Sequence, residues 1–375
     1  MNRCTVVILI DALGYELAES FSPAGLEWRV RLRSILGFSQ AALTTILTGC
    51  DPQDHGLWMM YSFAGKRSPF SWLKYLPGGI SSKRLLLRNA IRWKLGRLDG
   101  LRSYYSLYNV PRPVLPNLDL PSKERMFGPG GAGKTTNIFD HLKHTGEKWR
   151  VWDYRVDENL AFEELEHELK VAHEGFYMLY TAGLDSTMHR HGAHGEQVER
   201  KLSWYRERIE RITRAHPGVR IMVLGDHGMC EVTGSIDLIP LVDSLGPGIC
   251  AGFIPFYDST MARFRVLSER AGRELEGLLS GIDGGELLDR NSLERLGVFF
   301  EDGRFGDVIF LTDPGTIIVP SFMSSEPVAA MHGYDPDAGC MYAVMLTNFD
   351  PGALEMDLRE VTRVMVPDFE AVDKQ

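Results

Sequence analysis

Three short apolar runs of this 375-residue chain end in an aspartate, and this pattern constrains the fold more than any other feature. The runs are VVILI before Asp11, FYMLYTAGL before Asp185 and IMVLG before Asp226. Their length and their valine, isoleucine and tyrosine content predict buried β-strands. One aspartate after a strand is usually a turn former. Parallel strands would bring three of them to one edge of a sheet, where α/β proteins carry their sites.

Strands alternate with helices along most of the chain. Helical patterns such as AALTTILTG, TNIFDHLKHTG and GEQVERKLSWYRERIERITRAHPG separate the apolar runs. This alternation predicts an α/β fold, a three-layer sandwich around a mostly parallel sheet. The first apolar stretch, TVVILIDALG, meets Asp11 too early to be a signal sequence or a membrane span.

Two segments depart from this alternation. Residues 57–127 are rich in tryptophan, tyrosine, proline and basic residues, and residues 250–320 show a strand, helix, strand, helix, strand pattern of their own. We therefore expect a core formed by residues 1–249 and 321–375, which carries a basic and aromatic insertion at 57–127. We expect residues 250–320 to form a small inserted α+β cap.

The stretch GPGGAGKT, residues 128–135, matches the phosphate-binding P-loop pattern. A P-loop leaves the end of a buried strand, but the preceding NVPRPVLPNLDLPSKERMF carries four prolines, which a central strand does not accommodate. Thr136 or Asn137 suits the start of a following helix and Gly146 its end. We interpret the stretch as a glycine-rich connection. A P-loop NTPase, with Asp226 as the magnesium carboxylate, is the alternative.

Histidines follow two of the aspartates at the spacing of metal ligands. His189 lies four residues after Asp185, which is one helical turn. His191 and His194 are close by, and we prefer His189 for its spacing. His227 directly follows Asp226.

A third candidate histidine, His332, lies far along the chain in AAMHGYDPD. Glycine follows both His227 and His332, and Gly228 permits a tight backbone. Mixed aspartate and histidine ligands suit zinc, or manganese at a more oxygen-rich site.

A candidate nucleophile is Ser39, in GFSQAALTTILTGCDPQDHG. It lies at the start of a helix that we expect to end at Gly49. The positive end of the helix dipole favours a phosphate or an alkoxide there. Taken alone, Ser39 would be an ordinary helix cap.

Together these motifs resemble the alkaline phosphatase superfamily, and most of all its nucleotide pyrophosphatase/phosphodiesterase branch. The matching elements are Asp11, Ser39 with TILTGCDPQDHG behind it, LDSTMH, GDHGM and MHGYDPD. They occur in the family order and span nearly the whole chain. The resemblance implies an alkaline phosphatase-like fold and a metal-dependent enzyme that hydrolyses phosphoric esters.

The resemblance further implies a site for two divalent metal ions, Zn²⁺ or Mn²⁺. Ser39 would attack phosphorus and form a phosphoseryl intermediate. The ligands of the first ion would be Asp11, Ser39, Asp226 and His227. The ligands of the second ion would be Asp185, His189 and His332.

The chain also departs from the family pattern. The nucleophile of the phosphodiesterase branch is typically threonine, which Ser39 replaces, and the family's EPD element is GLD here. Met60 stands where the family has an asparagine that binds the phosphoryl oxygen. Lys66, Arg67 or Asn109 is a candidate substitute. Because this donor is missing, a non-catalytic metal-binding relative is one alternative.

The substrate class is the least constrained part of the prediction. We favour a phosphodiesterase or pyrophosphatase, with a phosphomonoesterase or a phosphomutase of the same superfamily as alternatives. Sulfatases need a proline- and arginine-bearing motif around the nucleophile, and SQAAL contains neither residue. Residues 58–61, WMMY, form either an apolar wall for a second organic arm of the substrate or ordinary packing.

Composition bounds the partners and the compartment. A net charge of −9 argues against a nucleic-acid polymer, which leaves a small phosphate ester as the expected substrate. The basic stretch at 83–98, KRLLLRNAIRWKLGRL, suits a membrane surface, an acidic substrate or a solvated helix. The five cysteines include no CxxC pair and suit a reduced, cytoplasmic protein. They are Cys4, Cys50, Cys230, Cys250 and Cys340.

Overall fold

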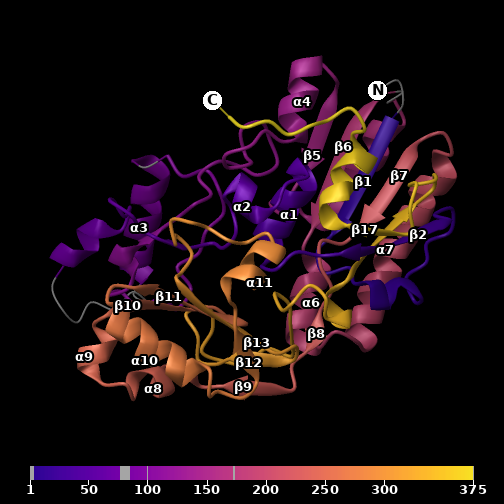
Figure 1. Ribbon diagram of the computed structural model, residues 1–375. Coiled ribbons are helices and arrows are strands. Elements are labelled where there is room, and N and C mark those ends of the chain that lie inside the picture. The colour runs from indigo at the N-terminus through magenta and orange to yellow at the C-terminus, as the bar shows by residue number, and fades with distance from the viewer. Residues whose placement is uncertain (1–3, 77–84, 99, 172–173, 375) are drawn as a thin grey trace. The chain divides into compact units, whose positions relative to one another are not determined.

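The computed structural model describes residues 4–76, 85–98, 100–171 and 174–374 (Figure 1). They form two compact units. The first unit comprises Met1–His55, Met126–Glu231 and Val328–Gln375, and the second comprises Gly56–Arg125 and Val232–Pro327. Within the described ranges, every helix is too short or too polar to cross a membrane.

A seven-stranded sheet forms the centre of the first unit, in the order β17-β2-β16-β7-β1-β6-β5. Strand β1 pairs in parallel with both β6 and β7, whereas β16 is antiparallel to β7 and β2. The predicted α/β fold with a mostly parallel sheet is confirmed. The strands are β1 Cys4–Ile10, β2 Trp28–Arg33, β5 Trp149–Trp152, β6 Gly175–Thr181, β7 Arg220–Leu224, β16 Ala343–Thr347 and β17 Glu355–Asp357. A separate pair joins β8 Cys230–Glu231 to β15 Ala330–Met331.

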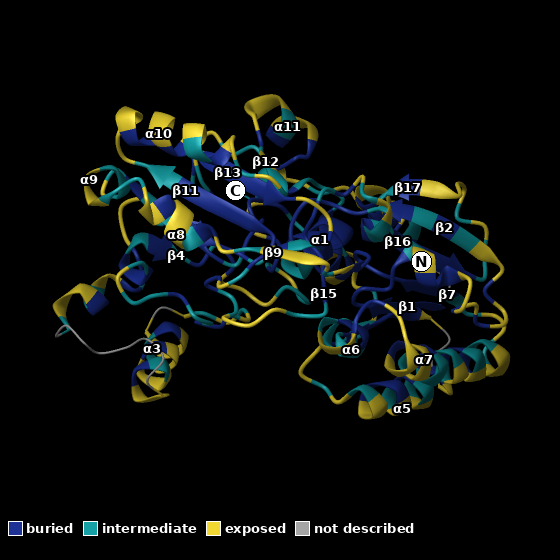
Figure 2. Cartoon of the chain, turned by 90° about the horizontal axis from the view of Figure 1, so that it is seen from below, coloured by how far each residue is buried: buried dark blue, intermediate teal, exposed yellow. Residues whose placement is uncertain are grey.

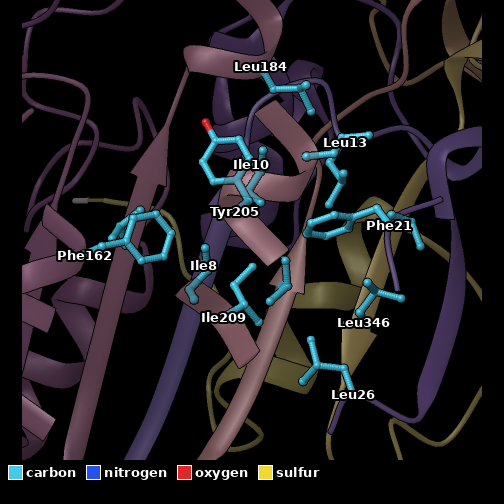
Figure 3. Close-up of a cluster of buried hydrophobic side chains, with 14 of the residues drawn as sticks. Ile8, Ile10, Leu13, Phe21, Leu26, Phe162, Leu184, Tyr205, Ile209 and Leu346 are labelled. Atoms are coloured by element: carbon cyan, nitrogen blue, oxygen red, sulfur yellow. The ribbon is translucent and has the colours of Figure 1, made fainter. Parts of the chain in front are cut away.

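Helices cover this sheet through apolar stripes. Helix α7, Glu196–Ala215, buries five residues at alternating spacings of three and four: Val198, Leu202, Tyr205, Ile209 and Ile212. Figure 3 shows Tyr205 and Ile209 beside Ile8 and Ile10 of β1. The outer turns of α7 and α5 are exposed (Figure 2). Burial of each large apolar side chain contributes roughly 1.5–3 kcal/mol to stability.

The remaining helices of the first unit include those that carry predicted site residues. They are α1 Ser39–Thr48, α2 Pro52–His55, α4 Ile138–Thr145, α5 Glu158–Leu169, α6 Gly183–His191 and α12 Val361–Met365. Short 3-10 helices occupy Tyr15–Ala18, Gly339–Met341 and Leu358–Glu360. Helix α1 ends at Gly49, which has a φ of 70° and is left-handed, as the sequence predicts.

The second unit has a four-stranded sheet of its own, in the order β10-β11-β13-β12. The strands of this sheet are β10 Phe253–Tyr257, β11 Met261–Val266, β12 Gly285–Leu287 and β13 Val308–Thr312. The unit also contains two separate strand pairs. One joins β3 Ser62–Phe63 to β4 Leu118–Asp119, and the other joins β9 Gly234–Ile236 to β14 Thr316–Ile318. Its helices are α3 Leu85–Arg97, α8 Leu238–Asp243, α9 Pro247–Cys250, α10 Glu269–Leu279 and α11 Arg290–Arg295, with 3-10 helices at Ser71–Tyr75 and Leu115–Asn117. The segments predicted as insertion and cap, 57–127 and 250–320, both contribute to this unit. Their boundaries as domains stay a prediction.

The aromatic stretch at 58–61 packs inside the second unit. Trp58 and Tyr61 are at most 1% exposed, and the Trp58 ring stacks on Phe300 at 6.1 Å between centroids. Phe305 closes the same ring edge-on at 5.6 Å. The interpretation as a substrate wall is therefore wrong for Trp58 and Tyr61, because the core of the unit already covers both rings.

Two of the five cysteines form a disulfide, Cys230–Cys340. Cys4, Cys50 and Cys250 keep free thiols. The expectation of reduced cysteines is therefore wrong for Cys230 and Cys340, because the fold brings together two residues that are 110 positions apart in the sequence. Cytoplasmic localisation stays a prediction.

Candidate metal centre

The three predicted carboxylates lie at the carboxyl ends of three adjacent strands. Asp11 follows β1, Asp226 follows β7 after one glycine, and Asp185 lies in the first turn of α6 after β6. The order β7-β1-β6 makes these strands neighbours (Figure 1). The predicted meeting of the three aspartates at one sheet edge is therefore present in the structure.

The first group of side chains surrounds the imidazole of His227. Its Nε2 lies 3.2 Å from Oδ1 of Asp11 and 3.4 Å from Oδ2 of Asp226. Gly228 allows the close approach of chain that this turn requires, since a Cβ there would lie 2.1 Å from the carbonyl oxygen of Cys340. The ligand atoms of the aspartates and of His227 all lie within 4.8 Å of one another.

Ser39 joins this group from the first residue of α1. Its Oγ lies 3.2 Å from His227 Nε2 and 3.4 Å from Asp11 Oδ1. The helix cap is Phe38, which has no side-chain cap hydrogen bond. The positive end of α1 therefore points to the group without a built-in anionic cap.

The second group surrounds Asp185. His189 lies one turn further along α6, with its Nε2 3.1 Å from Asp185 Oδ1. His332 reaches the same oxygen from the segment after β15, at 3.6 Å. The rings of His332 and His227 stack at 3.8 Å between centroids, so that His227 lies between the two groups. The ligand atoms of Asp185, His227 and His332 also lie within 4.8 Å of one another.

The orientation of His189 follows from its other ring nitrogen. Nδ1 lies 2.8 Å from the carbonyl oxygen of Ala330, and as a donor to that oxygen it leaves the lone pair of Nε2 to bind a metal ion beside Asp185. His191 and His194 are exposed. His194 Nε2 lies 4.0 Å from Glu16 at the surface. The structure thus places His189, as preferred, beside Asp185.

The chemistry of this buried cluster fits metal ions. Asp11, Asp226, His227 and His332 are at most 4% exposed. Across the part of the chain that the structure describes, Asp185 Oδ1, Asp226 Oδ2 and His332 Nδ1 form no hydrogen bond, although imidazole nitrogens lie 3.1–3.6 Å from the two carboxylate oxygens. Buried carboxylate oxygens without a partner are costly, and a divalent cation would compensate them.

Mutual electrostatics perturbs the titration of the cluster. Burial raises the pKa of Asp226, and the carboxylate of Asp11 raises it further, to about 8. Burial acts to lower the pKa of His227, but Asp226 and Asp11 outweigh it and raise the pKa to about 10. Burial lowers the pKa of His332 well below its ordinary value, and His227 and His189 add to this. Without metal, protons occupy positions that a divalent ion would take.

Tyr180 is a site residue that sequence reasoning missed. It lies on β6, and its hydroxyl donates a hydrogen bond to Asp11 Oδ2. Burial and the charge of Asp11 raise its pKa well above the ordinary value, which keeps the hydroxyl protonated as a donor. In the sequence, Tyr180 looks like any other apolar residue of a buried strand. Only its position next to the strand end that meets Asp11 could have drawn attention to it.

The candidates for the missing phosphoryl-oxygen donor belong to the second unit. Lys66 and Arg67 are exposed, and the backbone N–H of Asn109 donates to the carbonyl oxygen of Phe322 at 2.8 Å. Met60 packs against the apolar core of that unit. Which of the three candidates acts stays a prediction.

Comparison with protein families identifies a family for this chain. Residues 38–335 match the model of the family described as type I phosphodiesterase / nucleotide pyrophosphatase. A comparison with curated proteins finds no match.

Solved structures resemble the chain over nearly its whole length. Murine ectonucleotide pyrophosphatase/phosphodiesterase 5 superposes with a TM-score of 0.69 at 13% identity, over 97% of this chain and 94% of that one. The human protein of the same name gives 0.67 at 12%, with the same coverage of both chains. An inactive variant of the murine protein in complex with AMP gives 0.66 at 14%, again over 97% and 94%. At sequence identities this low, the structural similarity establishes a shared fold alone.

Proposed function

The chain belongs to the type I phosphodiesterase / nucleotide pyrophosphatase family, within the alkaline phosphatase superfamily, and we propose that it hydrolyses phosphodiesters or pyrophosphates at Ser39. The family is metal-dependent and acts on phosphate esters, so the chain is a metal-dependent phosphate ester hydrolase. The observation that supports the choice of site is the buried cluster of aspartate and histidine side chains around the Ser39 hydroxyl.

We propose two divalent ions, zinc or manganese, as the cofactors. When bound, a pair of such ions stabilises the charge on the entering and departing oxygens of an in-line displacement. The side chains that would hold the first ion are Asp11, Ser39, Asp226 and His227. Those that would hold the second ion are Asp185, His189 and His332.

Ser39 is the proposed nucleophile. Its Oγ forms a bond to phosphorus as the bond from phosphorus to the leaving-group oxygen breaks, and the hydroxyl proton passes to solvent. The product of this step is a phosphoseryl enzyme. Water then cleaves the Oγ–phosphorus bond, which releases phosphate or a phosphomonoester and restores Ser39. The positive end of α1 favours the anionic groups in both steps.

Tyr180 is a proposed positioning residue in this scheme. Its hydrogen bond to Oδ2 leaves Asp11 Oδ1 on the side of Ser39 and His227. Hydrogen bonds to a metal ligand from outside the site usually fix its orientation. Tyr180 therefore acts through Asp11 rather than on the substrate.

Small phosphate esters such as nucleotides fit the family, and the murine neighbour is described in complex with AMP. We propose a small-molecule ester of this kind as the substrate, without a nucleic-acid polymer. Phosphomonoester hydrolysis and phosphomutase activity are the alternatives within the superfamily. Contact with a membrane through residues 83–98 stays a prediction that is independent of this site.

A burst experiment tests the proposal. The protein is stripped of metal with a chelator, reloaded with Zn²⁺ or Mn²⁺, and mixed with an aryl phosphodiester or the matching aryl phosphomonoester. We expect no release from the stripped protein, and from the reloaded protein a burst of aryl alcohol that is larger with the diester. A larger burst with the monoester would reverse the substrate class. Bound metal without any turnover would identify a non-catalytic relative.

A further inference from the structure

Helix α3 of the second unit, Leu85–Arg97, has one face that packs and one that does not. Leu87, Ile91 and Leu95 recur every four residues and belong to the apolar core of the unit. On the rest of the helix Leu85, Leu86 and Trp93 are exposed at 71%, 84% and 57%. Figure 2 shows the exposed turns of α3 beside its buried stripe. Three large apolar residues on the solvent side of one short helix form a patch that a soluble surface rarely presents.

Leu86 and Trp93 form an exposed apolar ridge along this helix. At about 100° per residue, Leu86 and Trp93 lie within roughly 20° of one another and about 140–160° from the buried Ile91. Leu98, just beyond the helix, is also exposed, at 64%. The ridge therefore points away from the core that anchors the helix.

Basic residues flank this ridge on both sides. On the same helical geometry, Arg92 lies roughly 110° to one side of it, and Arg97 and Lys94 lie roughly 30° and 90° to the other. Residues 85–97 contain no aspartate or glutamate, although the chain as a whole carries a net charge of −9. The positive charge is thus a local property of this helix.

An apolar ridge with cations on both sides is typical of a helix that lies in the plane of a membrane interface. The apolar side chains enter the region between headgroups and acyl chains, where tryptophan is favoured. Long basic side chains bury their methylene groups while their charges reach the lipid phosphates. A second copy of α3 is a poor occupant of this face, because it would bring cations against cations with no acidic partner.

We propose that α3 docks the protein onto the surface of an anionic lipid bilayer. Leu86 and Trp93 enter the interface, and Arg92, Lys94 and Arg97 contact the lipid phosphates. This proposal is independent of the metal centre, since it rests only on residues of the second unit.

Vesicle flotation with the full-length protein tests it. We expect the protein to float with phosphatidylcholine vesicles that contain roughly 30 mol% phosphatidylglycerol, and not with phosphatidylcholine alone. Raising the salt to about 0.5 M should release it. The double variant Arg92→Gln, Arg97→Gln should weaken partitioning about 30-fold, and Trp93→Ala should weaken it about tenfold or more.

Matched controls come from the first unit. Arg200→Gln removes an exposed cation of α7, and Leu354→Ser removes a leucine that is 61% exposed. Both controls should float like the parent protein. Hydrolysis of a soluble aryl phosphodiester and the melting temperature are measured on every variant, which shows that the α3 variants are folded and separates this test from that of the active site.

Three results would overturn the proposal. They are no flotation of the parent protein with anionic vesicles, equal flotation with neutral ones, and flotation of the double variant at the parent level. Light scattering on the same samples measures the oligomeric state, and so tests whether a second copy of the chain covers this face. A parent dimer that Trp93→Ala converts to a monomer would make this face an interface between copies of the chain.

Discussion

Two loops of the first unit lead into helices, and both look from the sequence like places for a phosphate. Residues 128–135 precede α4 and match the P-loop pattern, whereas Ser39 begins α1, whose positive end favours a phosphate. The two loops differ in whether side chains of the protein accept hydrogen bonds from the backbone N–H groups at the start of the helix.

Before α4, the chain provides its own anion and its own cation. The Asp140 carboxylate accepts from the N–H of Gly130 at 2.9 Å and from that of Asn137 at 3.0 Å. Asn137 caps the helix, and its side chain also donates to the carbonyl oxygen of Gly128. Lys374 Nζ donates to the carbonyl oxygens of Gly130 and Gly133, at 2.8 and 3.2 Å.

Before α1, by contrast, the cap residue Phe38 offers no side-chain acceptor. The nearest polar groups to Ser39 Oγ belong to Asp11 and His227, which come from remote parts of the chain. The difference teaches that a glycine-rich pattern describes backbone freedom, whereas a binding site depends on which donors the rest of the fold leaves unsatisfied. A carboxylate already occupies part of the loop that resembles a P-loop.

The strongest way to break this comparison is to remove one side chain from each loop. We expect Ser39→Ala to lower kcat/KM for an aryl phosphodiester at least about 10³-fold, because it removes the nucleophile. Lys134→Ala should leave kcat/KM unchanged, although a P-loop would lose its phosphate-binding lysine.

Metal content, measured by elemental analysis on both variants, should stay close to that of the parent protein. Full activity in Ser39→Ala would eliminate the covalent mechanism. If only Lys134→Ala lost activity, the chemistry would belong to residues 128–135 and our assignment to Ser39 would be wrong.

A second and smaller expected effect is that His55 makes the free energy of unfolding depend on pH. His55 links the two loops, since its ring Nε2 lies 3.3 Å from Thr45 Oγ1 of α1 and its carbonyl oxygen accepts from the N–H of Lys134. Burial lowers the pKa of His55 to about 3. As pH falls below about 6.5, the unfolded chain binds a proton that the folded chain does not bind until about pH 3.

The free energy of unfolding should therefore fall by up to about 1.4 kcal/mol per pH unit from this residue, or about 2 kcal/mol between pH 6.5 and 5. Urea denaturation at several pH values measures the slope. His55→Gln should flatten it, and His144→Gln, on the exposed side of α4, should not. Parallel slopes for the parent protein and His55→Gln would contradict the assignment.

The smallest effect concerns the loop that resembles a P-loop. Asp140→Ala removes half of the capping box of α4 and the acceptor of Gly130, which should lower the free energy of unfolding by about 1 kcal/mol. Denaturant melts measure this loss, and diester hydrolysis should be unaffected. A fall in activity without a fall in stability would show that this loop contributes to the site after all.

Much of the fold could be predicted because buried strands and helices require apolar residues at regular positions in the sequence. The apolar runs that end at Asp11, Asp185 and Asp226 are strands β1, β6 and β7 or their continuations, and the helix from Ser39 to Gly49 is α1. Strand β2 and the edge strand β17 were missed. In β2 the sequence WRVRLR alternates apolar and charged residues, which is the pattern of a half-buried strand and not of a continuous apolar run.

The site divides in the same way. The spacing of LDSTMH and GDHGM indicates possible ligands because helix and turn geometry are local. The hydrogen bond from Tyr180 to Asp11, the Cys230–Cys340 disulfide and the burial of Trp58 depend on residues that are remote in sequence. No local pattern records such partners.

By itself, the sequence determined the α/β architecture, the strand ends that carry acidic residues and the helix that begins at Ser39, because periodicity and capping are properties of neighbouring residues. Only the tertiary structure decided which aspartate and histidine atoms share a buried space and which glycine-rich loop is already filled by a carboxylate. The physical reason is that hydrogen bonds, desolvation and charge act between atoms a few ångströms apart, whatever their separation along the chain.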